Sequence, residues 1–343
     1  MSKPRVWVSR PVFPDIVDRL RDVFDVHAET EERRYSSDEI ATRLADADAA
    51  IVGLAERIDA AALAGARRLR FVANLGVGYN NLDLDALTAA GVGASNTPDV
   101  LNETVADYAW ALMLAAARRM GEAERWVRDG QWKGSRFEGW LGADVHGKTL
   151  GILGMGRIGQ AIARRAAGFR SPVIYHNRSR LDPAIEHECG ASYVDKATLL
   201  ARADHLVLVL PFTPANRHVI GEAELKAMKP TATLTNIARG GIVDDAALAR
   251  ALADGTIAAA GLDVFEGEPQ VHPALMALPN VVLSPHIASA SRDTRRDMAS
   301  LAVDNVLAAF GQGPHAGRPP TILNPGVLAD AGGPSTHANT SLR

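Results

Sequence analysis

The sequence predicts an α/β protein of two lobes, each a parallel β-sheet with helices on its faces. Over the first hundred residues, short β-rich runs alternate with helical patterns, and from Lys148 the same alternation begins again more strongly. Such alternation is typical of parallel strands joined by helices. The chain of 343 residues is also long enough for two domains of roughly 150 residues each.

The elements of the first lobe follow from local patterns. A capping box, Ser36-x-x-Glu39, opens a helix toward Leu44, and a second helical pattern over residues 82–90 ends at Gly91. The runs with β character cover residues 5–9, 50–53, 69–73 and 92–95.

A second region begins near Pro98 with a long helical stretch, residues 101–119, that has apolar side chains on most faces. Such a helix should be widely buried, in a domain seam or a subunit interface. A last helix over residues 293–310 is too short to form a lobe and must dock on an existing one. Residues 326–343 are rich in Gly, Ser, Thr and Ala and predict a disordered tail. The strand patterns of the second lobe cover residues 149–153, 173–175, 206–210, 233–237, 258–262 and 281–283.

Composition and charge exclude several classes of protein. Hydrophobic residues make up 47% of the chain and charged residues 22%, which excludes a mainly disordered chain. With 37 basic and 40 acidic residues the net charge is −3, so neither nucleic acid nor anionic lipid is expected as a partner. The longest uncharged apolar run, about residues 108–117, is shorter than the ~20 residues of a membrane helix.

The single cysteine bears on the compartment. Cys189 cannot form an intrachain disulfide and is expected to be a buried or incidental thiol. No secretory signal is visible behind Met1. We therefore expect a protein of a reducing compartment, the cytoplasm.

A glycine-rich motif follows the first strand of the second lobe. Residues 154–159 match G-x-G-x-x-G, which is a weak signal alone because glycine is common in this chain. Here the motif follows an apolar strand and opens a helix, as in dinucleotide-binding proteins. We expect the helix N-terminus to face a pyrophosphate; a glycine-rich turn without a ligand is the alternative. The predicted contacts are Gly154, Met155, Gly156, Arg157, Ile158 and Gly159.

The end of the next strand predicts which dinucleotide binds. An NAD site places Asp or Glu about 20 residues after the glycines to hold the ribose 2′-OH. Here Asn177, Arg178 and Ser179 occupy that turn, and no carboxylate comes before Asp182. Arg178 can pair with a 2′-phosphate, and Ser179 can donate to it. We therefore predict that NADP(H) is preferred, with NAD(H) possible; the alternative is a solvated turn.

Three polar residues follow predicted strands of the second lobe. Arg239, Glu268 and His286 each come just after a strand, so they should project toward the edge that carries the glycine loop. Arg239 can bind a carboxylate and polarise a carbonyl, and His286 can donate a proton as a hydride arrives. Glu268 can orient the imidazole and stabilise its protonated form. A structural histidine and a solvated glutamate are the alternatives.

These segments resemble the D-isomer-specific 2-hydroxyacid dehydrogenase family over about residues 52–325. The matching motifs are residues 74–83, 102–107, 154–159, 236–241, 261–269 and 285–289. The resemblance implies a Rossmann NAD(P)-binding domain, residues 99–288, inserted into a flavodoxin-like substrate domain. The substrate domain would comprise residues 1–98 plus 289–325, and the cleft between the two domains would close over substrate.

The resemblance also implies the roles of further residues. Arg239, Glu268 and His286 would be catalytic, and the helix near residues 101–119 would help to form a homodimer. Gly76, Val77 and Gly78 would hold the substrate carboxylate through backbone N–H groups, unless they form a simple turn. Thr104 and Asp263 would contact the cofactor, unless they are helix or turn caps. Other implied contacts are Leu210, Pro211, Ile237 and Ala238 for the cofactor, and Leu54, Arg239, His286 and Ser289 for the substrate.

Within the family the chain looks most like glyoxylate/hydroxypyruvate reductases and 2-ketogluconate reductases. The implied reaction is NADPH-dependent reduction of glyoxylate to glycolate and of hydroxypyruvate to D-glycerate, without a metal. Val77 stands where phosphite-oxidising relatives have a lysine, and only a short tail follows Pro325 where some relatives carry a regulatory domain. The alternatives are reduction of 2-keto-gluconate or another longer acid, and a nucleotide-sensing protein like the related corepressors.

Trp140 resembles a residue that some glyoxylate reductases send into the neighbouring subunit's active site. An ordinary packed tryptophan is the alternative.

Overall fold

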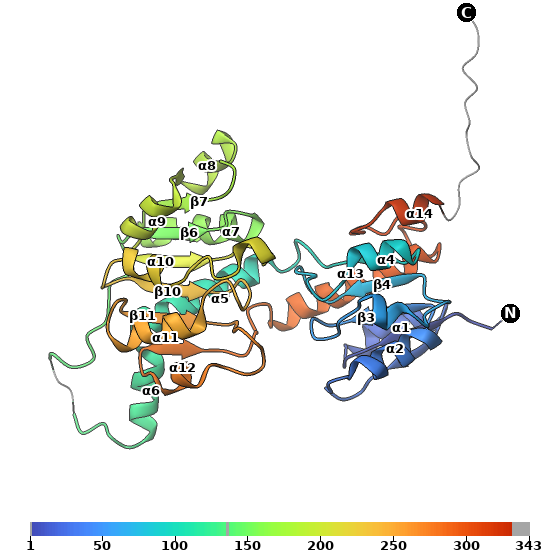
Figure 1. The fold of residues 1–343 in the computed structure, drawn as a ribbon, viewed down its shortest axis with the longest axis horizontal. Helices are drawn as coiled ribbons and strands as arrows, with labels where there is room; N and C mark the ends of the chain where they lie inside the picture. The colour runs from blue at the N-terminus through green and yellow to red at the C-terminus, as the bar shows by residue number, and fades with distance from the viewer. Residues whose placement is uncertain (1, 135–136, 331–343) are drawn as a thin grey trace, which may run out of the picture. The chain divides into compact units, whose positions relative to one another are not determined.

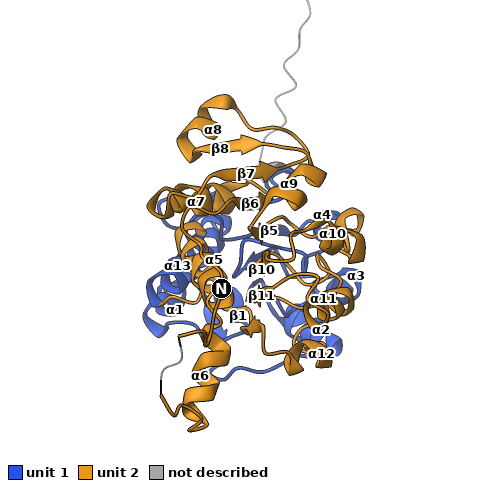
Figure 2. Ribbon diagram, turned by 90° about the vertical axis from the view of Figure 1, so that its left-hand side faces the viewer, with its two compact units in different colours: residues 1–101, 292–343 blue, residues 102–291 orange. Residues whose placement is uncertain are grey.

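The chain folds into two compact units, shown in the computed structural model of Figure 1 and coloured separately in Figure 2. The structure describes residues 2–134 and 137–330. Unit 1 comprises residues 1–101 and 292–343, and unit 2 comprises residues 102–291. Each unit is built on its own parallel sheet, as the sequence predicts.

Unit 1 contains a five-stranded parallel sheet in the order β2-β1-β3-β4-β5. Successive side chains of a strand point to opposite faces. Val6 and Val8 therefore pack against one set of helices, while Trp7 packs against the other. The strands are β1 (Arg5–Val8), β2 (Asp25–Ala28), β3 (Ala49–Val52), β4 (Phe71–Asn74) and β5 (Gly93–Ser95).

The two faces of this sheet are covered by different helices. α1 (Pro14–Arg21) and the long α13 (Arg292–Ala309) pack on the Val6 face, so the last long helix docks on an existing lobe as expected. The helices on the Trp7 side are α2 (Ser37–Asp46), α3 (Ala60–Leu63) and α4 (Leu84–Ala89). The predicted capping box is present at Ser36, where the hydroxyl accepts from the Glu39 N–H.

Unit 2 contains a seven-stranded parallel sheet in the order β12-β11-β10-β9-β6-β7-β8. The chain starts at β6, runs outward to β8, then returns to β9 and runs the other way. The strand order thus reverses beside β6, and ligands of such sheets bind outside the carboxyl ends of the strands at that point. The strands are β6 (Leu150–Leu153), β7 (Val173–His176), β8 (Ala191–Tyr193), β9 (His205–Leu208), β10 (Thr233–Asn236), β11 (Ala259–Leu262) and β12 (Val281–Leu283).

Helices cover both faces of this larger sheet. α5 (Asn102–Ala117) packs against β9 to β12 and against α7, so its own sheet buries the apolar side chains that the sequence shows. Gly261 of β11 allows α5 to pack closely on the sheet, because a Cβ at this position would lie only 2.7 Å from the Leu112 side chain of α5. The other helices are α6 (Met120–Arg128), α7 (Arg157–Arg165), α8 (Pro183–Cys189), α9 (Lys196–Arg202), α10 (Glu222–Ala227), α11 (Asp245–Ala253) and α12 (Pro273–Ala277), with short 3-10 turns η1 (Ala166–Phe169) and η2 (Pro214–Asn216).

The structure differs from the sequence analysis in a few places. The edge strands β2 and β8 are not among the expected strands, because edge positions are half exposed and lack a continuous apolar run. The chain changes unit after residues 101 and 291, slightly later than the expected boundaries. The expected disordered tail is wrong for its first residues, because α14 covers Gly326–Asp330; residues 331–343 lie outside the described residues. No helix in the described part of the chain is both long and apolar enough to cross a bilayer.

Candidate active site

The glycine motif forms a tight turn between β6 and α7. Gly154 has φ +104°, and a Cβ there would lie 2.8 Å from the backbone nitrogen of Leu210, which follows the neighbouring strand β9. A Cβ on Gly159 would overlap the Gly154 carbonyl oxygen. Both positions therefore require glycine, because another stretch of backbone lies too close to each of them for a side chain to fit.

The middle glycine faces open space. A Cβ on Gly156 would meet no atom within 4 Å, so nothing in the protein demands a glycine there. Gly156 is also the N-cap of the nine-residue α7, and no side chain caps this helix. The first N–H groups of α7 therefore have no side-chain cap, and no protein atom blocks the approach of a ligand to the backbone at Gly156. Such a helix N-terminus suits a pyrophosphate. The residues present therefore fit a dinucleotide.

The turn after β7 is joined to the glycine loop. The Met155 N–H donates to Asn177 Oδ1 at 2.6 Å, while the Met155 side chain is fully buried. Asn177 thus places the following residues, Arg178 and Ser179, next to the end of β6.

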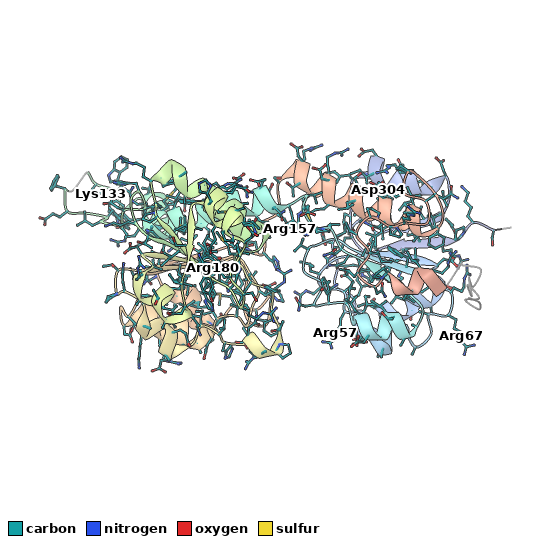
Figure 3. The ribbon with its side chains drawn as sticks, turned by 90° about the horizontal axis from the view of Figure 1, so that it is seen from above. Arg57, Arg67, Lys133, Arg157, Arg180 and Asp304 are labelled. Carbon is teal, nitrogen blue, oxygen red and sulfur yellow. The ribbon has the colours of Figure 1, made fainter. Side chains whose placement is uncertain are left out.

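The two arginines of this turn differ in their partners. Arg180, labelled in Figure 3, donates to both carboxylate oxygens of Glu186 at 2.9 and 2.7 Å, and this carboxylate raises the pKa of Arg180. The Tyr175 hydroxyl donates to the same carboxylate at 2.7 Å. Arg178 is exposed and forms no ion pair or hydrogen bond with any residue that the structure describes. Arg178 is therefore the cation of this turn that is available to a ligand.

Arg239, Glu268 and His286 follow the neighbouring strands β10, β11 and β12. Glu268 Oε2 and His286 Nδ1 are 2.8 Å apart, and both side chains are about one-third exposed, at 33% and 30%. Burial favours the neutral carboxylic acid, but the hydrogen bond and positive charge of His286, the Phe265 N–H and Arg239 outweigh it. The pKa of Glu268 is therefore lowered, and the group is a carboxylate at neutral pH.

Arg239 lies on a loop in which side chains form hydrogen bonds with the backbone of the same loop. Asn236 Oδ1 accepts from the Ala238 N–H at 3.0 Å, and the Arg239 guanidinium donates to the Ala238 carbonyl at 2.6 Å. Burial of the guanidinium lowers the pKa of Arg239, while the charge of Glu268 opposes this effect. A Cβ on Gly240 would overlap the Phe265 carbonyl, so the Arg239 and Glu268 loops touch backbone to backbone.

The loop that carries His286 is held by one buried carboxylate. Asp263 accepts the N–H groups of Ile287 and Ala288, both at 2.9 Å, and the Ser284 hydroxyl at 2.7 Å. His286 itself has φ +56° and donates its N–H to the Asp263 carbonyl at 2.9 Å. Asp263 therefore acts as the cap of a strained turn, and its contact with a cofactor remains a prediction.

In unit 1, the loop after β4 presents backbone N–H groups. The carbonyl of Gly76 accepts from Thr97 N–H at 3.0 Å, and that of Gly78 accepts from Asn74 Nδ2 at 3.0 Å. The Val77 carbonyl accepts from Asn96 Nδ2 at 2.7 Å. Within the described residues, the N–H groups of Val77 and Gly78 have no acceptor. Backbone N–H groups without a protein acceptor can bind an anion.

The residues that hold these loops are not among the predicted site residues. Asn74 and Asn96 stand at the carboxyl ends of β4 and β5, and Asn81 donates to the Gly53 carbonyl beside Leu54 at 3.0 Å. An asparagine at the end of a buried strand, or directly after it, is the signal that could have identified Asn74 and Asn96, because Asn side chains readily bond nearby backbone groups.

The remaining predicted contacts occupy loop and helix ends. Thr104 lies in the first turn of α5, and Ser289 follows the His286 turn. Leu54 is exposed after β3 in unit 1. Leu210 and Pro211 follow β9, while Ile237 and Ala238 follow β10 and are buried. In unit 2 these strand ends lie at the same sheet edge as the glycine loop.

A dinucleotide loop at the point of strand reversal, with an arginine and a Glu-His pair after adjacent strands, defines an NAD(P)-binding oxidoreductase. Residues 110–288 match the family model for the NAD-binding domain of D-isomer specific 2-hydroxyacid dehydrogenases. The chain belongs to that family.

Named relatives and solved structures support the same assignment. A glyoxylate reductase of Thermococcus onnurineus is 47% identical over 331 residues, 95% of this chain and 97% of that protein. A glyoxylate reductase structure from Paecilomyes thermophila has a TM-score of 0.83 at 33% identity and covers 94% and 99% of the two chains. An NADPH-dependent glyoxylate/hydroxypyruvate reductase from Sinorhizobium meliloti, in complex with NADP and malonate, has a TM-score of 0.80 at 37% identity over 91% and 95%.

Proposed function

We propose that this protein reduces small 2-oxo acids with NADPH, converting glyoxylate to glycolate and hydroxypyruvate to D-glycerate. The observation that supports it most directly is the 2.8 Å hydrogen bond between Glu268 and His286, on loops adjoining that of Arg239. The names of the relatives and of the similar structures agree with this substrate class.

His286 is the proton donor in this proposal. Its Nδ1 faces Glu268, which leaves Nε2 for the carbonyl oxygen of the substrate. The Glu268 carboxylate orients the ring and stabilises the imidazolium that gives up the proton. NADPH, when bound, would supply a hydride from C4 of its nicotinamide ring and would leave as NADP⁺. The 2-oxo acid gains the hydride at C2 and the proton on oxygen, and it leaves as the 2-hydroxy acid.

Two groups are proposed to bind the charged end of the substrate. The Arg239 guanidinium can clamp the carboxylate and polarise the adjacent carbonyl. The N–H groups of Val77 and Gly78, which have no acceptor among the residues that the structure describes, suit a carboxylate as well. Leu54, Gly76 and Ser289 are proposed as further substrate contacts.

Steady-state kinetics with a substrate panel test the proposal. Purified protein is assayed with glyoxylate, hydroxypyruvate and 2-keto-gluconate, each with NADPH and with NADH. We expect turnover of the two short acids with NADPH near the enzyme median of about 10 s⁻¹. The highest kcat/KM on 2-keto-gluconate would move the assignment to longer acids. Cofactor binding without turnover of any acid would contradict an enzymatic role.

We propose that Arg178 selects NADPH through its 2′-phosphate. Arg178→Ala is expected to raise KM for NADPH roughly ten- to a hundredfold, since a charge-assisted hydrogen bond contributes roughly 1.5–3 kcal/mol, and to leave KM for NADH nearly unchanged. The measurement is KM for both cofactors at saturating 2-oxo acid. Arg202→Ala is the matched control, because Arg202 is an exposed arginine of the same unit at the end of α9. An equal effect on the two cofactors would remove the 2′-phosphate contact.

We also propose a homodimer that covers the α6 region. No described side chain of α6 is buried, and Met120, Val127, Trp132 and Leu141 are exposed by 52–67%. Exposed apolar side chains gathered in one segment are typical of protein interfaces. Trp140 packs on Trp126 of its own chain, with ring centroids 5.2 Å apart. A role for Trp140 in the partner's active site remains a proposal.

A further inference from the structure

We propose that His218 is a positioning residue that ties the Arg239 loop to the Glu268 loop and so keeps Glu268 in place against His286. The role in turnover rests on the proposed 2-oxo acid reduction. His218 lies between η2 and α10, outside the predicted site residues.

His218 binds both loops, each two residues from its functional side chain. Its backbone N–H donates to the Gly241 carbonyl at 2.7 Å, just beyond Arg239. Its Nε2 lies 2.8 Å from Glu266 Oε2, just before Glu268. A single residue thus bonds the backbone of one loop and a side chain of the other.

Glu266 is held at three points, which makes it a firm anchor. Its carboxylate is paired with Arg217 as well as with His218, and its backbone N–H donates to Asp245 Oδ2 at 2.9 Å. Burial alone would raise the pKa of Glu266, but His218 and Arg217 outweigh it and the pKa is lowered. Asp245 belongs to the first turn of α11 and is only 5% exposed. The Glu268 loop is therefore fastened to α11 and to the His218 loop.

The strained backbone conformation of His218 indicates that the contacts of this residue hold it in place. Its φ is +53°, a left-handed conformation that costs free energy in residues other than glycine. Such outliers persist where the surrounding contacts impose them, often near functional sites. The imidazole is 27% exposed, and its Nδ1 lies 3.9 Å from Asp244 while Nε2 meets Glu266. The ring therefore stands between two carboxylates.

The contacts of His218 distinguish positioning from catalysis. Within the described part of the chain it makes no hydrogen bond or ion pair with Glu268 or His286. It can act on the reaction only through the geometry of the two loops. A misplacement of a catalytic group by about 1 Å can lower the rate roughly a hundredfold, so a loosened Glu268 loop should lower kcat.

Three substitutions at residue 218 separate the side-chain bond from backbone strain. His218→Asn tolerates the left-handed backbone but is too short to reach Glu266. His218→Gln reaches Glu266 with an N–H donor. His218→Ala removes both the hydrogen bond to Glu266 and the tolerance of the left-handed backbone. We expect kcat for glyoxylate to fall roughly 10- to 100-fold in the Asn and Ala variants and to recover in the Gln variant, with KM for NADPH nearly unchanged in all three.

The second readout does not depend on activity. The ¹⁵N-histidine NMR spectrum should show the Nδ1–H proton of His286 in its hydrogen bond to Glu268, assigned by its loss in His286→Gln. We expect this signal to broaden or disappear in the Asn variant and to persist in the Gln variant. Glu222→Gln is the matched control, since it breaks an exposed ion pair with Lys226 on α10 of the same unit. Glu266→Gln, which weakens the same contact from the other side, replaces any variant that does not fold.

The outcomes are distinguishable. If the wild-type protein turns over no 2-oxo acid, the proposed function fails, and the NMR signal alone still decides the role of His218. An unchanged signal and unchanged kcat in His218→Asn would overturn the positioning role. Loss of the signal in Asn but not in Gln would establish it.

Discussion

Replacing His286 with glutamine is expected to lower kcat for glyoxylate reduction by roughly 10²- to 10⁴-fold, the usual contribution of a positioned general acid. Glutamine can still donate a hydrogen bond, but it cannot give up a proton to the carbonyl oxygen. Binding of NADPH, measured by fluorescence titration, should change little. The kcat is measured with saturating NADPH and substrate.

The partner of His286 gives a graded comparison. Glu268→Gln keeps a hydrogen-bonding oxygen beside Nδ1 but removes the charge that stabilises the imidazolium. The loss of kcat should be smaller than in His286→Gln, because the imidazole can still donate its proton to the carbonyl oxygen. His187→Gln is the control, since His187 is an exposed histidine on α8 of the same unit. A His286→Gln variant with wild-type kcat would place the proton donor elsewhere.

Removal of the guanidinium at position 239 should have the next largest effect. Arg239→Ala is expected to lower kcat/KM for every 2-oxo acid by roughly 10²- to 10³-fold, since it removes charge stabilisation from the carbonyl and a clamp from the carboxylate. The kcat should fall and the KM for the 2-oxo acid should rise. Arg239→Lys should recover only part of the loss, because an ammonium cannot make two parallel hydrogen bonds to a carboxylate.

A control for Arg239 is available in the same unit. Arg250 lies on α11 with its side chain 62% exposed, so Arg250→Ala changes the net charge equally and should retain full activity. The comparison is made by kcat/KM over the substrate panel. Wild-type kcat/KM in Arg239→Ala on every acid tested would show that the clamp assignment is wrong.

The fold was largely predictable because the sequence pattern and the physics of parallel sheets agree. Apolar runs such as Leu150–Leu153 and Ala259–Leu262 are buried on both faces and are visible as continuous apolar segments. The half-exposed β2 and β8 carry no such signal, and they are strands because a neighbouring strand offers them hydrogen bonds. Pairing at a sheet edge is a tertiary property.

The candidate site divides in the same way. The positions of Arg239, Glu268 and His286 were predictable because each comes after a strand that the sequence pattern indicates, and parallel strands end at a common edge. For Asp263 the sequence left a cofactor contact and a turn cap open, and the contacts of His218 were not predictable, since both residues form hydrogen bonds with loops far along the chain. Nothing near His218 in the sequence indicates that Glu266, 48 residues later, is its partner.

The sequence by itself determined the strand–helix alternation, the dinucleotide loop with its three glycines, and which side chains stand at the strand ends. These features are local, since they depend on periodicity and on residue type at one position. Only the tertiary structure decided that Arg180 pairs with Glu186, whereas Arg178 pairs with no residue of the described ranges, and that Asp263 caps the His286 turn. Such choices depend on distances between distant segments, and those distances are set when the strands pack side by side.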